Sequence, residues 1–96
     1  MTNEYQQAKI VYTIVEREID FYYQMQKYET HHELIVTPQT VTTAKKEFPI
    51  QDVIDFSYKP FSSEAGILYL HTNQGVFPFN IHSNPQALIE TFRTFK

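Results

Sequence analysis

The sequence predicts a mainly β domain that ends in a single α-helix, on three observations. Short segments of alternating apolar and polar residues are separated by turn residues about every eight to twelve positions, which is typical of antiparallel sheets. The last part of the chain instead spaces its apolar residues by three and four, as an amphipathic helix does. The 96 residues are 42% hydrophobic and contain no cysteine, so one core without disulfides must hold one domain over residues 1–96.

The first strand is predicted over Lys9–Glu16, after a loose N-terminal segment of residues 1–7. Most residues from Ile10 to Val15 are β-branched, which favours a strand over a helix. A helix over Glu4–Glu18 is the alternative, because that stretch contains few helix breakers.

A second strand is predicted over Ile19–Gln26, after a polar turn at Glu16-Arg17-Glu18. Its residues alternate with a period of two over eight positions, which is typical of a half-buried strand. Five more strands are predicted over His32–Val36, Thr40–Ala44, Asp52–Tyr58, Ile67–Thr72 and Val76–His82.

The connections between these later strands carry turn residues. Thr37-Pro38-Gln39-Thr40 places proline at the second position of a tight turn, where its fixed φ is suitable. Lys45-Lys46-Glu47 is interpreted as a solvated polar reversal, and residues 61–66 as the longest loop. The strand over Asp52–Tyr58 is expected to place Ile54, Phe56 and Tyr58 on one face.

The last hairpin is predicted around Asn73-Gln74-Gly75, as a three-residue turn with Gly75 in the left-handed region. Phe77, Phe79 and Ile81 then face inward. Pro78 cannot donate a ladder hydrogen bond, so its strand is predicted to be an edge strand or to be bulged there.

The terminal helix is predicted to begin at Asn84-Pro85, with Asn84 as the N-cap and Pro85 at the first helical position. It should run for about eleven residues. So short a helix is only marginally stable alone and must pack its apolar stripe on the sheet. The stripe consists of Leu88, Ile89, Phe92 and Phe95, with Leu88 and Phe92 as the main anchors.

Seven strands followed by one C-terminal helix resemble the pleckstrin-homology-like fold, and the resemblance covers about residues 8–96. It is carried by Phe48–Tyr58, by the hairpin over Ile67–His82 and by the helix start at Asn84-Pro85. The chain looks like a small bacterial member of that group. The resemblance implies a seven-stranded, two-sheet barrel plugged by the helix, and a module that binds extended peptides.

The chain departs from the lipid-binding members of that group at the first turn. Those members carry clustered lysine and arginine there, whereas Arg17 lies between two glutamates. The glutamates would neutralise Arg17 and repel a phosphate, which argues against phosphoinositide binding.

Several function classes are disfavoured by composition. The only two glycines, Gly66 and Gly75, cannot form a P-loop or a dinucleotide-binding glycine motif. The net charge of −3 is unfavourable for nucleic acid and for anionic membranes. No stretch approaches the ~18–20 apolar residues of a membrane span, and no signal sequence is visible, so a cytoplasmic protein is expected.

No catalytic set is evident, so the protein is expected not to be an enzyme. Asp52 and Asp55 are three residues apart and would lie on opposite faces of a strand. His71 and His82 are placed at opposite ends of one hairpin, too far apart for a joint role.

A metal site is the alternative interpretation of Glu29, His31 and Glu33, which share one face of a strand. A solvated strand end explains the same residues, so no metal or other cofactor is predicted.

The predicted binding site comprises Tyr22, Gln24 and Tyr58. It is chosen because Pro78 should block pairing at its own sheet edge, leaving the other sheet opening free. Most of the aromatic residues are expected to pack in the core or on the sheet. The expected partner is a protein or peptide, with a homodimer formed through sheet edges as the alternative. A binder of a small ligand or of a lipid headgroup is the less favoured alternative.

Overall fold

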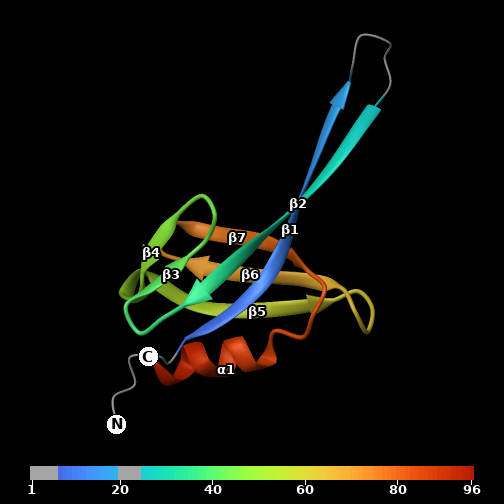
Figure 1. Cartoon of the computed structure of the whole chain (residues 1–96). Helices are drawn as coiled ribbons and strands as arrows, with labels where there is room; N and C mark the ends of the chain where they lie inside the picture. The colour runs from blue at the N-terminus through green and yellow to red at the C-terminus, as the bar shows by residue number, and fades with distance from the viewer. Residues whose placement is uncertain (1–6, 20–24) are drawn as a thin grey trace.

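A seven-stranded antiparallel sheet and one helix make up the fold in the computed structural model, which describes residues 7–19 and 25–96. The strand order is β4-β3-β2-β1-β7-β6-β5 (Figure 1). The elements are β1 (Ala8–Ile19), β2 (Met25–Val36), β3 (Thr40–Thr42), β4 (Glu47–Pro49), the 3-10 helix η1 (Ile50–Asp52), β5 (Val53–Pro60), β6 (Gly66–Thr72), β7 (Gly75–Ile81) and α1 (Gln86–Thr94).

The sheet is continuous and wraps around one core. Every strand and the helix contribute side chains to that core, whose members are Ile10, Tyr12, Leu34, Val36, Val41, Phe48, Val53, Phe56, Leu68, Leu70, Ile81, Leu88, Ile89 and Phe92. The end strands β4 and β5 do not pair with each other, so the sheet is not closed. The mainly β fold with a C-terminal helix is confirmed, whereas the predicted closed barrel of two sheets is wrong.

Strands β1 and β2 form a hairpin arm that extends beyond the rest of the sheet (Figure 1). They pair without interruption from Ala8↔Val36 to Ile19↔Met25, but β1 pairs with β7 only at Tyr12↔Ile81 and Thr13↔Asn80. The molecule is accordingly elongated, with extents of 58 × 28 × 25 Å.

The predicted turn at Glu16-Arg17-Glu18 is wrong, because these residues lie within β1 and Arg17 pairs with Lys27. None of the three is a glycine, proline, asparagine or aspartate, the residues that tight turns favour, so the backbone ladder continues through them. The alternative of a helix over Glu4–Glu18 is also wrong over the part that β1 covers.

The predicted strand over Ile19–Gln26 is not a single strand. Ile19 ends β1 and pairs with Met25, the first residue of β2, while residues 20–24 lie outside the described residues. The predicted strand over His32–Val36 is the end of the longer β2, and Glu47–Pro49 forms the unpredicted β4. The predicted number of strands, seven, therefore agrees with the structure. The predicted strand over Ile19–Gln26 is not among them, and β4 was not predicted.

The two short turns that flank β3 form largely as predicted. The Thr37 hydroxyl accepts hydrogen bonds from the backbone N–H groups of Gln39 (3.2 Å) and Thr40 (3.0 Å). At the next turn the Thr43 hydroxyl accepts from the N–H groups of Lys45 (3.3 Å) and Lys46 (3.1 Å). These bonds fix the β3–β4 turn and with it the backbone positions of both lysines.

A β-bulge near the start of β5 changes which residues face the core. The register shifts between Val53, which pairs with Thr72, and Asp55, which pairs with His71. Val53 is therefore buried and Ile54 is 65% exposed, contrary to the prediction that Ile54 faces the core with Phe56. The extra residue of the bulge shifts the alternation by one position.

The β6–β7 turn is one residue shorter than predicted, with Thr72 paired directly to Gly75. The positive φ of Gly75, 129°, is confirmed. A Gly75→Ala variant should lose about 1–2 kcal/mol of unfolding free energy, because a side chain is strained at that φ. Since a Cβ there meets nothing within 4 Å, the cost is conformational and not steric. Urea unfolding measures it, and an unchanged midpoint would contradict the assignment.

Pro78 lies where β7 pairs on one side only. The two-residue turn makes Thr72↔Gly75 a hydrogen-bonded pair, and alternation then makes Tyr69↔Pro78 a pair without ladder hydrogen bonds. The nitrogen of Pro78 points away from β6, so no ladder bond is lost. The prediction of an edge strand or a bulge is wrong, because β7 lies between β6 and β1 and pairs with β6 without a register shift. Proline is tolerated because, within the described residues, the β1–β7 pairs reach only Asn80 and Ile81.

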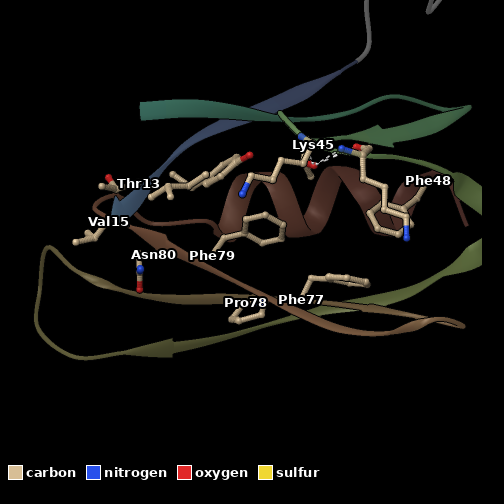
Figure 2. Close-up of a pocket in the computed structure, with 12 residues that line it drawn as sticks. Thr13, Val15, Lys45, Phe48, Phe77, Pro78, Phe79 and Asn80 are labelled. Atoms are coloured by element: carbon tan, nitrogen blue, oxygen red, sulfur yellow. Dashed lines mark hydrogen bonds between the residues drawn. The ribbon is translucent and has the colours of Figure 1, made fainter. Parts of the chain in front are cut away.

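Helix α1 lies against β1, β2 and β5. The helix has nine residues and its N-cap is Pro85, one residue later than predicted. The Asn84 side-chain carbonyl still accepts a hydrogen bond from the N–H of Gln86 (2.9 Å), which satisfies one free donor at the helix start. Leu88, Ile89 and Phe92 are buried and Phe95 is half-buried, as predicted. The helix thus covers the core on the side away from the groove described below (Figure 2).

Candidate functional site

A groove of about 460 Å³ opens where β1 and β7 stop pairing. Its walls are residues 12–15 of β1 and residues 77–80 of β7, and the β3–β4 turn with Phe48 closes one end. Figure 2 shows these side chains lying between the strands, with the helix behind them. We refer to this feature as the β1–β7 groove. Its volume is in the range of small-molecule and peptide side-chain sites.

Aromatic rings form the floor of the β1–β7 groove. Tyr12 is 3% exposed and meets Phe79 edge to face, with the ring centroids 4.7 Å apart. The rings of Phe48 and Phe77 have centroids 5.3 Å apart. The Tyr12 hydroxyl accepts a hydrogen bond from the backbone N–H of Ala44 (3.0 Å), which ties the floor to the β3–β4 turn. The floor is therefore apolar and rigidly held.

Two lysines stand at one end of the β1–β7 groove, and among the side chains that the structure describes its lining contains no aspartate or glutamate. The Lys46 ammonium lies 5.2 Å from the ring centroid of Phe48 and 5.5 Å from that of Phe77, within the range of cation–π attraction. Lys46 also donates a hydrogen bond to the side-chain carbonyl of Gln74 (2.8 Å). The groove is therefore locally positive in a chain whose net charge is −3.

The backbone beside the β1–β7 groove is open for pairing. The alternation that turns Pro78 away from β6 also makes Thr13↔Asn80 the hydrogen-bonded pair between β1 and β7. The N–H and C=O of Val15, two residues along β1, therefore point to the same side as those of Thr13, where β7 has left. Within residues 7–19 and 25–96, β7 pairs with β1 only at Tyr12 and Thr13, so no strand pairs with Val15 on the groove side.

The sequence-predicted site residues are not brought together in the described part of the chain. Tyr22 and Gln24 lie outside the described residues, so their part of the prediction is untested. Tyr58 is half-buried, packs against the core and does not line the β1–β7 groove. Its ring also covers Gly66, where an added Cβ would lie 2.6 Å from Cε1 of Tyr58.

Lys45 and Lys46 are exposed in a turn, as predicted from the sequence, but their position at the end of the groove was not predicted. The polar residues of this segment indicated a turn. Lys46 lies beside Phe77 because the β3–β4 turn meets the β6–β7 turn, and the bond between Lys46 and Gln74 joins residues 28 positions apart. The inward phenylalanines at 77 and 79 were the available signal, since half-buried aromatic rings at a sheet opening favour binding.

A polar cluster on the outer face of β5 and β6 was also missed. The Ser57 hydroxyl lies 2.7 Å from Nε2 of His71, and Asp55 faces His71 across the strands. Asp55 accepts bonds from Nε and Nη2 of Arg93 at 3.4 and 3.3 Å. The cluster lies outside the β1–β7 groove. We interpret this cluster as a set of polar contacts that attach α1 to the sheet through Arg93 and Asp55.

The pKa of Asp55 is lowered on balance. Burial alone would raise this pKa, but the Arg93 hydrogen bonds, the backbone N–H of Phe56 and the charges of Arg93 and His71 together outweigh it. A lowered folded-state pKa stabilises the fold above the ordinary carboxyl range, and this stabilisation is lost as the pH falls below about 4.

An Asp55→Asn variant should therefore be less stable than the wild type at pH 7, by well under about 1 kcal/mol because both partners are solvent-exposed. At pH 2 to 3 the difference should shrink, since wild-type Asp55 is then increasingly protonated. Urea unfolding at both pH values measures this, with Glu64→Gln in the exposed β5–β6 loop as control. A difference that stays constant with pH would contradict the ion-pair assignment.

The histidines of β2 form no metal site with their neighbours. The Thr13 hydroxyl lies 3.3 Å from Nδ1 of His31, and Glu33 is 4.0 Å from the Lys9 ammonium. Among the described residues, no three histidine, aspartate or glutamate side chains are close enough together to hold a metal ion.

Comparisons with known proteins identify no relative. No protein-family model, curated protein or solved structure matches the chain. Within the described residues, no helix has both the length and the apolar character that a membrane crossing requires.

Proposed function

We propose that this protein is a non-enzymatic interaction module that docks an extended peptide segment of a protein partner. The observation that carries the proposal is the β1–β7 groove, where an aromatic floor lies directly beside an unpaired edge of β1. A peptide that added a strand to that edge would gain backbone hydrogen bonds, while its alternate side chains entered the groove.

The docked strand should pair with β1 and not with β7. On β7, the residue that points its backbone toward the groove is Pro78, which has no N–H to donate. On β1, Val15 offers both its N–H and its C=O on the groove side. The proline thus limits indiscriminate pairing at one wall and directs the partner to the other.

We further propose a pleckstrin-homology-like identity for the fold. It is supported by a four-strand meander (β1 to β4) and a three-strand meander (β5 to β7) joined through the β1–β7 pairing, with one C-terminal helix covering the core. The open sheet and the long hairpin arm are departures from a closed barrel. The arm leaves the seam between the two meanders open, and the groove lies in that seam.

A proline substitution at Val15 tests the docking mode. Phage-displayed random peptides would first be selected on the full chain, and the affinity of the enriched peptides measured by fluorescence anisotropy. Val15→Pro should weaken binding by about tenfold or more, because it removes the free N–H without touching the β1–β2 ladder. Val15→Thr, which keeps the N–H, should bind nearly as the wild type does. Selection of no peptide, or equal binding by the Val15→Pro variant, would refute the proposal.

A homodimer through the same edge is the second candidate function, favoured by the free backbone of β1 beyond Thr13. Light scattering after size-exclusion chromatography at high protein concentration separates the two functions. A monomer supports peptide docking, whereas a dimer that dissociates in the Val15→Pro variant supports self-association.

A further inference from the structure

We infer that the segment docked in the β1–β7 groove carries a carboxylate two residues from a bulky apolar side chain. This inference rests on the proposed function and adds the chemistry of the partner. The apolar side chain lies on the rings of Tyr12 and Phe79, and the carboxylate lies at Lys45 and Lys46.

The apolar requirement follows from the floor. Phe77 and Phe79 are only partly buried although both pack against the core, so part of each ring surface faces the groove. A leucine, isoleucine or phenylalanine from a partner would remove that ring surface from water at about 25 cal/mol per Å². A small or polar side chain would leave the same surface hydrated or without contacts.

The acidic requirement follows from the charges at the closed end. Within the described residues no carboxylate lies within 4.0 Å of Lys45 or Lys46, since the ion pairs formed there involve Lys9 and Arg93. The side-chain partners of Lys46 are the neutral Gln74 and two aromatic rings, which hold the ammonium in place without cancelling its charge. A carboxylate entering the groove would meet the Lys46 ammonium, which these contacts hold in place, and the second positive charge of Lys45.

The spacing of two residues follows from strand geometry. Side chains at positions i and i+2 of a strand point to the same side, about 6.6–6.8 Å apart, while position i+1 points away. Both recognised side chains must lie on the same face of the docked strand, because the aromatic floor and the lysines line one groove. The Lys46 ammonium lies 5.5 Å from the ring centroid of Phe77, which is two residues from Phe79 on β7, so the step from the floor to the charge matches one such interval. The inferred pattern is an apolar residue and an aspartate or glutamate separated by one freely variable residue.

The free edge of β1 is what favours a peptide over a small apolar acid. A free acid could use the rings and the lysines but would leave the N–H and C=O of Val15 without new partners. A docked strand uses all three features of the groove at once.

Peptide selection tests this inference separately from the proposed function. Random heptapeptides displayed on phage would be selected against the full chain, and the enriched sequences scored for an acidic residue two positions from an apolar one. Enrichment of that pattern supports the inference. Enrichment of apolar peptides without it would overturn the inference but leave the proposed function standing. Enrichment of no peptide, with binding of free phenylpropionate or decanoate instead, would overturn both.

Lysine variants test the same inference by affinity. For an enriched peptide, Lys45→Gln/Lys46→Gln should weaken binding by about threefold to tenfold, and so should replacing the peptide's acid with its amide. The two losses should not add, because each removes the same ion pair. Lys59→Gln, which removes a positive charge from exposed β5, is the matched control and should leave affinity unchanged.

Reversing the charges of Lys45 and Lys46 tests their role most directly. Selection on Lys45→Glu/Lys46→Glu should replace the acidic residue of the pattern with lysine or arginine while keeping the apolar one. Raising the salt concentration should weaken binding to the wild type and leave binding to the glutamine variant nearly unchanged. A selection that still returns acidic peptides would overturn the role of the two lysines.

Discussion

Replacing Phe92 with alanine is expected to lower the free energy of unfolding by about 3–5 kcal/mol. Phe92 is 1% exposed, and its ring meets that of Phe56 edge to face with the centroids 5.1 Å apart. Alanine would lose this burial and leave a cavity between α1 and β5 that the surrounding core can fill only in part. A loss of this size is a large share of the stability of a domain of this length.

Phe61→Ala is the matched control, because it makes the same chemical change at a residue that is 62% exposed. It should change the unfolding free energy by no more than about 0.5 kcal/mol. Urea unfolding measures both variants, and Phe92→Leu, which keeps most of the volume, serves if the alanine variant does not fold. If Phe92→Ala cost no more than Phe61→Ala, the helix would not be docked as described.

The helix and its anchors could be predicted from the sequence because the signals are local. Asn84-Pro85 defines the start, and apolar residues at spacings of three and four define the buried face. The residues of β7 that face inward, Phe77, Phe79 and Ile81, could be predicted for the same reason, because their placement depends only on the two-residue alternation of a strand. Such patterns fix what each segment buries without reference to any other segment.

The arm and the register of β5 could not be predicted because their signals are not local. Glu16-Arg17-Glu18 lacks the residues that tight turns favour, but its polarity alone does not distinguish a turn from a strand; the pairing with β2 makes it part of β1. The bulge that exposes Ile54 arises from the pairing of β5 with β6, and one added residue moves every earlier side chain to the other face.

The candidate site was predictable only in its parts. An aromatic cluster and an exposed lysine dipeptide are both visible in the sequence. The groove exists because β1 and β7 pair at just two positions and then separate, a property of the sheet as a whole. Its walls come from segments more than 60 residues apart, so the spacing of residues along the chain gives no signal for it.

Replacing Gly66 with alanine is expected to lower the free energy of unfolding by about 2–3 kcal/mol, by overpacking. Gly66 is buried at the start of β6, where it pairs with Pro60 on one side and with Ile81 on the other. An added Cβ would lie 2.6 Å from Cε1 of Tyr58 and 2.7 Å from the backbone oxygen of Lys59. The tyrosine ring can move, but the carbonyl belongs to the β5 ladder and can move only if the strand does.

The double variant Gly66→Ala/Tyr58→Leu separates these two contacts. Leucine has no atom equivalent to Cε1, so the ring clash is removed while the carbonyl clash stays. We expect the loss of unfolding free energy caused by the added methyl group to be only partly relieved in the Tyr58→Leu background, because the 2.7 Å approach to the backbone oxygen of Lys59 remains. If the methyl group had no effect in the Tyr58→Leu background, Tyr58 alone would require a glycine at position 66. If the Gly66→Ala single variant lost less unfolding free energy than Gly75→Ala, β6 would not approach β5 this closely.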